Sequence, residues 1–177
     1  MRRTRQALAA RGTVRGAFFS LGTTPSHVPR LDCAKAIIDL FEAAQKTAHV
    51  AIFTLTEPRI VAAMVAAHER GVAIIVVADA EQSQSPENPA QKKAIAKLQR
   101  AGITVRLAVK QTGLMHNKVG IFDAKTICTG SFNWTGAAEK RNDENLLVVD
   151  GTQVAAAYEK FVFQRILTKE TLVEPEA

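Results

Sequence analysis

The stretch "HVAIFTLTEPRIVAAMVAAHERGVAIIVVAD", residues 49–79, decides the fold class of this chain. It opens with an apolar run, continues through a segment with Pro58 near its start and Gly71 at its end, and closes on "VAIIVVAD". Because proline is tolerated in the first turn of a helix and glycine is favoured just past the last turn, the middle segment is predicted to be helical. A continuous apolar run is typical of a strand covered on both faces. The stretch therefore predicts a strand–helix–strand unit.

The same alternation continues on both sides of this stretch. Apolar residues at helical spacing predict further helices at 33–44, where Asp32 is the expected N-cap, at 90–102 and at 152–167. Short apolar runs predict strands at 16–22, 103–109, 115–122, 126–131 and 142–150. The Ser, Pro and Asn content of 80–89 predicts a loop. Strands alternating with helices indicate an α/β fold, and we expect a mixed, largely parallel sheet with helices on both faces.

Length and charge divide the chain into three parts. With 177 residues and 47% hydrophobic content, it can form one domain with a buried core, which we place at 16–167. Residues 1–15 are predicted to be a flexible basic leader, and 168–177 a mobile tail. Residues 1–30 contain no acid and six arginines: Arg2, Arg3, Arg5, Arg11, Arg15 and Arg30. The rest holds 17 basic and 17 acidic residues, so the net charge of +6 belongs to residues 1–30, and the basic leader could contact anionic partners.

The leader also bears on the cellular compartment. Arg11 and Arg15 interrupt its apolar residues, so it lacks the unbroken stretch of about 7–15 residues found in a secretory signal. An Arg-rich, acid-free N-terminus fits an organellar presequence or a solvated basic tail, and both interpretations stay open. No apolar run reaches the roughly 18–20 residues that span a membrane. Cys33 and Cys128 suggest neither a disulfide framework nor a zinc site, which fits a reducing compartment. Without a clean signal peptide, we slightly favour a cytoplasmic location over a secreted, periplasmic or organellar one.

Polar residues cluster within an apolar stretch, "LMHNKVGIFDAKTICTGSFNWT", residues 114–135. Because strand residues two apart share a face, His116 and Lys118 are expected to project together. Ser131 and Asn133 would do the same at the end of the next strand, if the extended conformation continues that far. Glu144 opens a third apolar strand and could reach the same cleft.

This set of side chains suits chemistry on a phosphate diester. Lysine, serine and asparagine can donate hydrogen bonds to anionic oxygens, and histidine can act as a nucleophile or a general acid/base. A carboxylate on the far imidazole nitrogen would fix the tautomer of the histidine. No cluster of acidic residues suited to magnesium accompanies these groups, so we expect neither a metal nor another cofactor.

The ordered set resembles the HxKx4D motif of the phospholipase D superfamily and its GSxN continuation. The matching residues are His116, Lys118, Asp123, Gly130, Ser131 and Asn133. Glu144 falls where small single-motif bacterial endonucleases of this superfamily carry the glutamate that holds the histidine. Residues 51–79 look like the strand–helix–strand segment that precedes the motif in those nucleases, and the resemblance covers roughly 16–167.

The resemblance implies the phospholipase D/nuclease-like fold and a metal-independent phosphoryl transfer in two steps. One histidine attacks phosphorus and forms a phosphohistidine, while a second protonates the leaving oxygen and then activates water. The implied catalytic residues are His116, Lys118, Ser131, Asn133 and Glu144. Asp123 sits at a turn-like position, and its implied role is structural.

The chemistry needs two histidines, and the chain has one motif. His27, His49 and His68 lack a lysine two residues on. We therefore predict a homodimer with one composite active site at a two-fold axis, to which each subunit contributes one His116.

A second interpretation stays open for the roles of two groups of residues. Ser131 and Asn133 could instead cap a short helix that follows them. Asp143 could replace Glu144 as the inward-facing carboxylate, although strand parity and the family's spacing favour Glu144.

Three further residues are candidate substrate contacts. Trp134 could stack on a nucleobase at the cleft mouth, or it could pack at the rim or at the dimer interface. Lys140 and Arg141 could hold substrate phosphates, or they could belong to a solvated face.

Three functions are compatible with these residues. The first is a nonspecific endonuclease that cleaves DNA, or RNA, because small single-motif members of the superfamily resemble nucleases most. The second is a phospholipase D-type hydrolase or transferase acting on phospholipid. The third is a noncatalytic nucleic-acid-binding or targeting module, against which the complete set of reactive residues argues. The sequence does not decide strand preference or biological role.

Overall fold

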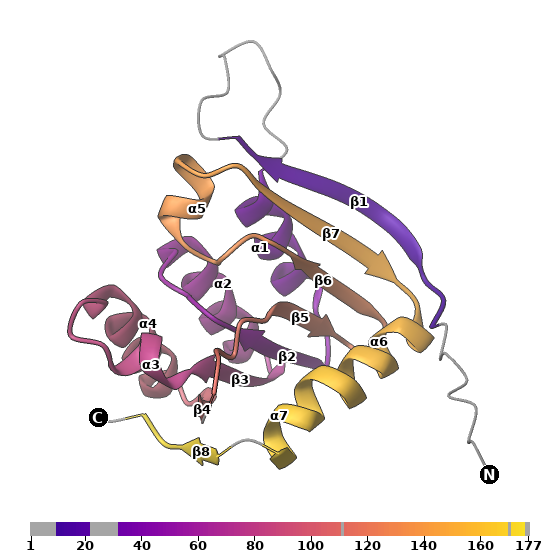
Figure 1. The fold of residues 1–177 in the computed structure, drawn as a ribbon. Coiled ribbons are helices and arrows are strands. Elements are labelled where there is room, and N and C mark those ends of the chain that lie inside the picture. Colours follow the sequence, from indigo (N-terminus) through magenta and orange to yellow (C-terminus); the bar gives the residue numbers. More distant parts are fainter. Residues whose placement is uncertain (1–9, 22–31, 111, 170, 176–177) are drawn as a thin grey trace.

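The computed structural model describes residues 10–21, 32–110, 112–169 and 171–175, in which one eight-stranded sheet is covered by helices (Figure 1). The strand order across the sheet is β1-β7-β6-β5-β2-β3-β4-β8. The strands are β1 (Thr13–Ser20), β2 (Thr47–Ile52), β3 (Ala73–Asp79), β4 (Thr104–Val109), β5 (Lys118–Phe122), β6 (Thr126–Gly130), β7 (Glu144–Asp150) and β8 (Thr171–Val173).

Parallel pairing is confined to one part of the sheet. β2, β3 and β4 are mutually parallel, whereas β1, β7, β6, β5 and β2 form an antiparallel series and β8 is antiparallel to β4. The predicted mixed sheet is confirmed, but its parallel part is narrower than expected. The reason is that β5 and β6 are joined by a short turn, which suits antiparallel neighbours, while parallel strands need a crossover connection.

Helices cover both faces of the sheet, as predicted. They are α1 (Cys33–Ala43), α2 (Pro58–Glu69), α3 (Ala80–Gln84), α4 (Pro89–Arg100), α5 (Gly136–Lys140), α6 (Thr152–Tyr158), the π-helical segment η1 (Glu159–Phe163) and α7 (Gln164–Lys169). Figure 1 shows α6 and α7 crossing the face opposite to α1 and α2. A large apolar core buries Phe41, Ile60 and Leu98 against one face, and a smaller one buries Phe163 and Ile166 against the other.

The strand–helix–strand prediction for 49–79 is confirmed. Pro58 occupies the first turn of α2, and Gly71, with φ of +98°, follows the helix in the left-handed region that glycine tolerates. β2 then pairs in parallel with β3 along the full length of β2. Asp32 caps α1 as expected, because its carboxylate accepts a hydrogen bond from Lys35 N at 2.8 Å.

Three boundary predictions are wrong. Part of the predicted loop at 80–89 forms α3, which Asp79 caps by accepting from Gln82 N at 3.0 Å. The predicted leader overlaps β1, where Arg15 pairs with Asp150 at 2.6 Å. The predicted mobile tail contains β8, which covers the edge of β4. Residues 1–9, His27 and Arg30 lie outside the described residues.

Candidate active site

His116 lies just before β5, not inside a strand as the sequence predicted. The strand expected at 115–122 begins only at Lys118, which pairs with Ile52 of β2. The side chain of His116 is exposed. Since regular sheet pairing does not include His116, other contacts must set the position of its imidazole.

Lys118 is buried beside His116, with 6% of its surface exposed. Its Nζ donates a hydrogen bond to the carbonyl oxygen of His116 at 3.0 Å. Nζ also lies 4.9 Å from the centroid of the Phe53 ring, a cation–π contact. The Phe53 and His116 rings are 4.6 Å apart between centroids and tilted by 57°. The predicted pair is therefore brought together, and both side chains contact the Phe53 ring.

The contribution of Phe53 was missed by sequence reasoning. Phe53 directly follows β2, and it reaches the site because β2 and β5 are antiparallel neighbours in a register that pairs Ile52 with Lys118. Its backbone N–H also donates to Asn117 O at 2.8 Å. Residue spacing along the chain contains no signal for this register, so no motif could have identified Phe53.

The charges of Lys118 and Glu144 face the same space. Burial lowers the pKa of Lys118, and attraction to the Glu144 carboxylate partly opposes this shift. Strand register agrees with this arrangement, because Lys118 and Glu144 project on the face that carries α1 and α2. The contacts with His116 O and Phe53 hold the Lys118 ammonium in place, so that it can attract an anionic group that binds at this site.

Ser131 and Glu144 form a hydrogen-bonded pair across neighbouring strands. The Ser131 hydroxyl donates to Oε2 of Glu144 at 2.5 Å, and it accepts from Asn145 N at 3.1 Å. Asn142 Nδ2 donates to Oε1 of the same carboxylate at 3.1 Å. Glu144 is half-buried whereas Asp143 is exposed, so the preference for Glu144 over Asp143 is supported.

Gly130 permits this contact between β6 and β7. A Cβ atom at position 130 would lie 2.1 Å from the carbonyl oxygen of Asn145, a distance that no side chain can occupy. The same carbonyl accepts from Ser131 N at 3.1 Å. The glycine of the GSxN sequence is therefore required by the close approach of two backbones.

Asn133 lies two residues beyond Ser131, in the segment that precedes α5, and is half-buried. Its Oδ1 is buried and has no hydrogen-bond partner in the described part of the chain. The alternative that Ser131 and Asn133 cap α5 is wrong, because Thr135 is the N-cap and its hydroxyl accepts from Ala138 N at 3.1 Å. The amide nitrogen Nδ2, and not this acceptor oxygen, is the atom of Asn133 that can donate a hydrogen bond to an anionic group.

Trp134 does not lie at the mouth of the site. It is 0% exposed, and its ring packs edge-on against Phe41 at a centroid distance of 6.1 Å. Its backbone is paired with the segment after β2, through Trp134 N to Thr54 O at 3.0 Å. The predicted base-stacking role is therefore wrong: Trp134 is a core residue that fixes the segment carrying Asn133.

Comparison with known proteins places this arrangement in a family. The sequence model described as "Cardiolipin synthase, PLD-like domain" matches residues 37–167. The chain belongs to the phospholipase D-like family. A protein named phospholipase D from Rickettsia bellii is 37% identical over 131 residues, which cover 73% of this chain and 62% of that protein. A protein named mitochondrial cardiolipin hydrolase from Xenopus laevis is 33% identical over 70% of this chain and 55% of its own length.

Two solved structures share the fold. Nuc from Salmonella typhimurium, a phospholipase D family member, superimposes with a TM-score of 0.77 and 25% identity over 93% of this chain and 99% of that chain. NucT from Helicobacter pylori gives a TM-score of 0.68 with 25% identity over 77% of this chain and 88% of its own. The chain thus spans nearly all of Nuc but less than two thirds of the Rickettsia bellii protein.

Asp123, the last residue of the phospholipase D-like motif, holds the turn between β5 and β6. Its carboxylate accepts hydrogen bonds from the backbone N–H groups of Lys46 at 2.7 Å, Thr47 at 3.0 Å and Gln45 at 3.1 Å. Partial burial would raise the pKa of Asp123, but these donors together outweigh burial and lower it. The contacts support the structural role expected for Asp123.

The remaining candidates flank the phospholipase D-like site. Lys140 ends α5, Arg141 follows as its C-cap, and both are exposed. His49 contacts Glu159 at 2.9 Å and stacks on Phe163, while His68 contacts Val72 O at 3.1 Å.

Within the described ranges, no group of three or more His, Cys, Asp or Glu side chains could hold a metal, and no helix is long and apolar enough to cross a membrane.

Proposed function

We propose that the chain hydrolyses phosphate diesters, with His116 as nucleophile and Lys118, Ser131 and Asn133 stabilising charge on the phosphate. The observation that carries the proposal is the buried Lys118 ammonium, 3.0 Å from the His116 carbonyl oxygen, with both side chains against Phe53. A fixed cation beside an exposed imidazole suits attack on an anionic diester. Membership of the phospholipase D-like family supports the same reaction class.

The proposed reaction has two steps and uses no metal. An imidazole nitrogen of His116 attacks phosphorus, and the leaving oxygen takes a proton from a second histidine. That second histidine then removes a proton from water, which attacks the phosphohistidine and regenerates His116. Each such proton transfer contributes about 10²–10⁴ to the rate. Glu144 is the carboxylate proposed to orient a histidine.

We propose a homodimer because the mechanism needs two histidines. The two other described histidines, His49 and His68, are engaged with Glu159 and Val72 away from Lys118. A two-fold axis would bring two copies of His116 to one composite site, together with both copies of Lys118.

The proposed substrate is nucleic acid, DNA in the first instance. Support comes from the similarity to Nuc along nearly the whole of both chains. Exposed Lys140 and Arg141, at the end of α5 before β7, are proposed to contact flanking phosphates. Phosphate contacts of this kind are independent of base sequence, which fits a nonspecific endonuclease.

Phospholipid is the second candidate substrate. The names of the curated relatives, phospholipase D and mitochondrial cardiolipin hydrolase, support it. So does an exposed apolar strip, Phe19, Leu21 and Leu147, at β1 and β7. Exposed apolar side chains of this kind could contact a lipid surface.

One experiment tests the reaction and separates the substrates. The protein is incubated in EDTA with plasmid DNA, single-stranded DNA, RNA, or vesicles of cardiolipin or phosphatidylcholine, alongside His116→Ala. His68→Ala serves as a control for loss of a histidine outside the site. We expect DNA cleavage that is abolished by His116→Ala and retained by His68→Ala. Lipid turnover without DNA cleavage would favour the second substrate, and cleavage that needs added magnesium would contradict the mechanism.

A further inference from the structure

The backbone on both sides of His116 is held by hydrogen bonds from outside the motif. Met115 N donates to Oδ2 of Asp79 at 3.1 Å. On the other side, Asn117 O accepts from Phe53 N at 2.8 Å. Since His116 lies before β5, these two bonds replace the sheet pairing that would fix a residue within a strand.

The first anchor, Asp79, lies at the end of β3 and is 3% exposed. Besides Met115, it binds the start of α3: Oδ1 accepts from Gln82 N at 3.0 Å, and its carbonyl accepts from Ser83 Oγ at 2.7 Å. Both carboxylate oxygens are therefore engaged by backbone N–H groups. A buried carboxylate with such partners is rigidly oriented.

The second anchor is Gln91, which lies on α4, is 0% exposed and acts through the segment that contains Phe53. Its Oε1 accepts from Leu55 N at 2.6 Å, and its Nε2 donates to Phe53 O at 3.4 Å. Nε2 also donates to Ser83 Oγ at 3.1 Å. Gln91 thus fixes the segment after β2 whose Phe53 contacts both His116 and Lys118.

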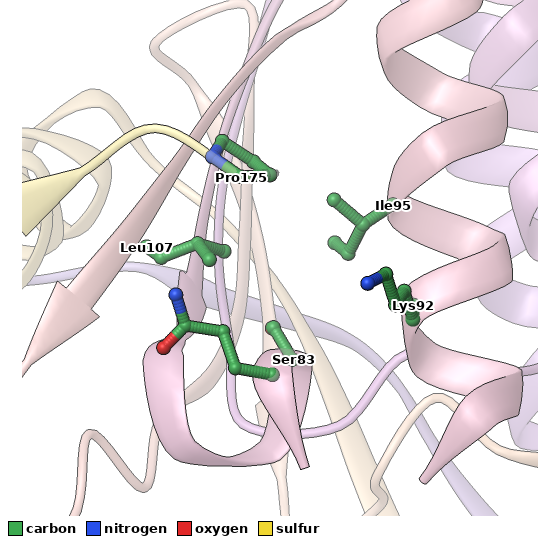
Figure 2. Close-up of a pocket in the computed structure, with 6 residues that line it drawn as sticks. Ser83, Lys92, Ile95, Leu107 and Pro175 are labelled. Carbon is green, nitrogen blue, oxygen red and sulfur yellow. The ribbon is translucent and has the colours of Figure 1, made fainter. Parts of the chain in front are cut away.

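Asp79, Ser83 and Gln91 form one connected buried network, in which Ser83 Oγ donates to the Asp79 carbonyl oxygen and accepts from Gln91 Nε2. Figure 2 shows Ser83 facing a small cavity whose other walls include Ile95, Leu107 and Pro175. The cavity measures about 10 Å³, which is too small for a substrate. Asp79, Ser83 and Gln91 are each at most 4% exposed, so the hydrogen bonds of the network lie in a low-dielectric interior where they are strong and directional.

We propose that Asp79 and Gln91 are positioning residues for His116: they hold, through Met115 N and through Phe53, the two sides of the segment that presents the imidazole. Neither residue touches the reacting atoms. This inference rests on the proposed function only in its predicted effect on kcat. A displacement of about 1 Å in a catalytic group costs about 100-fold in rate, so loss of either anchor should lower kcat and leave KM unchanged.

The test uses Asp79→Asn and Gln91→Met in the full chain. Asparagine keeps one acceptor oxygen, so it cannot accept from both Gln82 N and Met115 N, while methionine keeps the volume of Gln91 but none of its hydrogen bonds. Ile95→Val on the same helix is the matched control, because it weakens the core beside the network without removing a polar contact. The substrate is bis(4-nitrophenyl) phosphate, an activated diester that does not depend on the natural substrate.

Two further measurements need no substrate: hydrogen exchange at the Met115 amide, and the NMR chemical shifts of the His116 imidazole. We expect kcat to fall about 100-fold in both variants with KM unchanged, and Met115 exchange to rise about 10-fold in Asp79→Asn. The His116 imidazole signals should move in both variants and stay unchanged in Ile95→Val. Unchanged Met115 exchange and His116 signals, or an equal loss of kcat in Ile95→Val, would overturn the inference. An inactive wild type would instead count against the proposed function, and the two NMR measurements would still decide the positioning roles.

Discussion

The hydroxyl of Ser131 donates a hydrogen bond to Oε2 of Glu144 across 2.5 Å, where β6 ends and β7 begins. Because the same hydroxyl oxygen accepts from Asn145 N, its proton is directed toward the carboxylate. Asn142 holds the other carboxylate oxygen at 3.1 Å. Ser131 and Glu144 therefore behave as one unit in the site, in which each orients the other.

The first prediction concerns this unit. Ser131→Ala should lower kcat about 100-fold, because Glu144 loses the hydrogen bond that orients its carboxylate. Glu144→Gln should cost a similar factor, and the double variant should cost little more than either alone, because contacting residues are non-additive. Steady-state kinetics on a diester measures all three, with Ser85→Ala, a serine near α3, as the control. Fully additive losses would show that Ser131 and Glu144 act independently.

The second prediction tests the composite site. Wild-type and His116→Ala subunits are mixed in equal amounts and allowed to exchange. If one active site needs a His116 from each subunit, only about a quarter of the dimers are active, whereas independent sites would leave half of the activity. The measurement is initial rate against mixing ratio, with His68→Ala in place of His116→Ala as the control. A straight line through the mixing series would rule out a shared site.

The third prediction separates stability from activity at Lys118. Burial lowers the pKa of Lys118, so folding disfavours its charged form. Lys118→Met should abolish activity while leaving the free energy of unfolding equal to, or about 1 kcal/mol above, that of the wild type at pH 7. As pH rises through the lowered pKa toward the ordinary value of 10.5, wild type gains stability and the difference should shrink. Urea unfolding measures this, and a loss of several kcal/mol at pH 7 would contradict it.

Much of the fold could be predicted from local sequence. Pro58, Gly71 and the apolar runs around them predicted the β2–α2–β3 unit, because these signals act within a few residues. The extent of parallel pairing could not be predicted, since it depends on which distant strands become neighbours. The strand β8 was missed for the same reason: its pairing with β4 joins the end of the chain to its middle.

For the site too, nearby residues in the sequence could be predicted to act together, whereas contacts between residues far apart in the sequence could not. The ordered residues from His116 to Glu144 predicted a shared cleft, and the structure brings Lys118, Phe53 and His116 together. Strand alternation was the wrong reason for His116, which precedes β5. Trp134 was misassigned because its burial depends on packing against Phe41, a residue far away in the sequence.

The fourth prediction concerns Asp123. Asp123→Ala removes the acceptor for three backbone N–H groups and places alanine at a φ of +50°, so it should destabilise the protein by about 2–3 kcal/mol. Asp123→Asn should cost less, because asparagine keeps an acceptor oxygen and tolerates this backbone conformation. The pKa of Asp123 is lowered below 3.8 in the folded state, so its stabilisation is present above that pH and is lost as pH falls through the folded value. Urea unfolding from pH 7 downward should therefore show the difference between wild type and Asp123→Ala shrinking at acid pH, and a pH-independent difference would contradict the charge-based account.

The fifth prediction concerns Glu139, a buried carboxyl on α5 that contacts Ser20 and the start of α1. Burial, together with the neighbouring Asp32, raises the pKa of Glu139 to about 7, while Ser20 Oγ and Ala34 N donate to its Oε2 at 3.1 and 3.2 Å. Because the folded pKa lies above the ordinary value of 4.5, the protonated form is favoured by folding, and this contribution is lost as pH rises from about 4.5 through 7. Glu139→Gln mimics the protonated form, since its amide can accept from Ser20 and donate to Asp32. Its free energy of unfolding should therefore fall less over this pH range than that of the wild type, whereas exposed Glu87→Gln should follow the wild type. Parallel curves for wild type and Glu139→Gln would show that Glu139 does not titrate in this range.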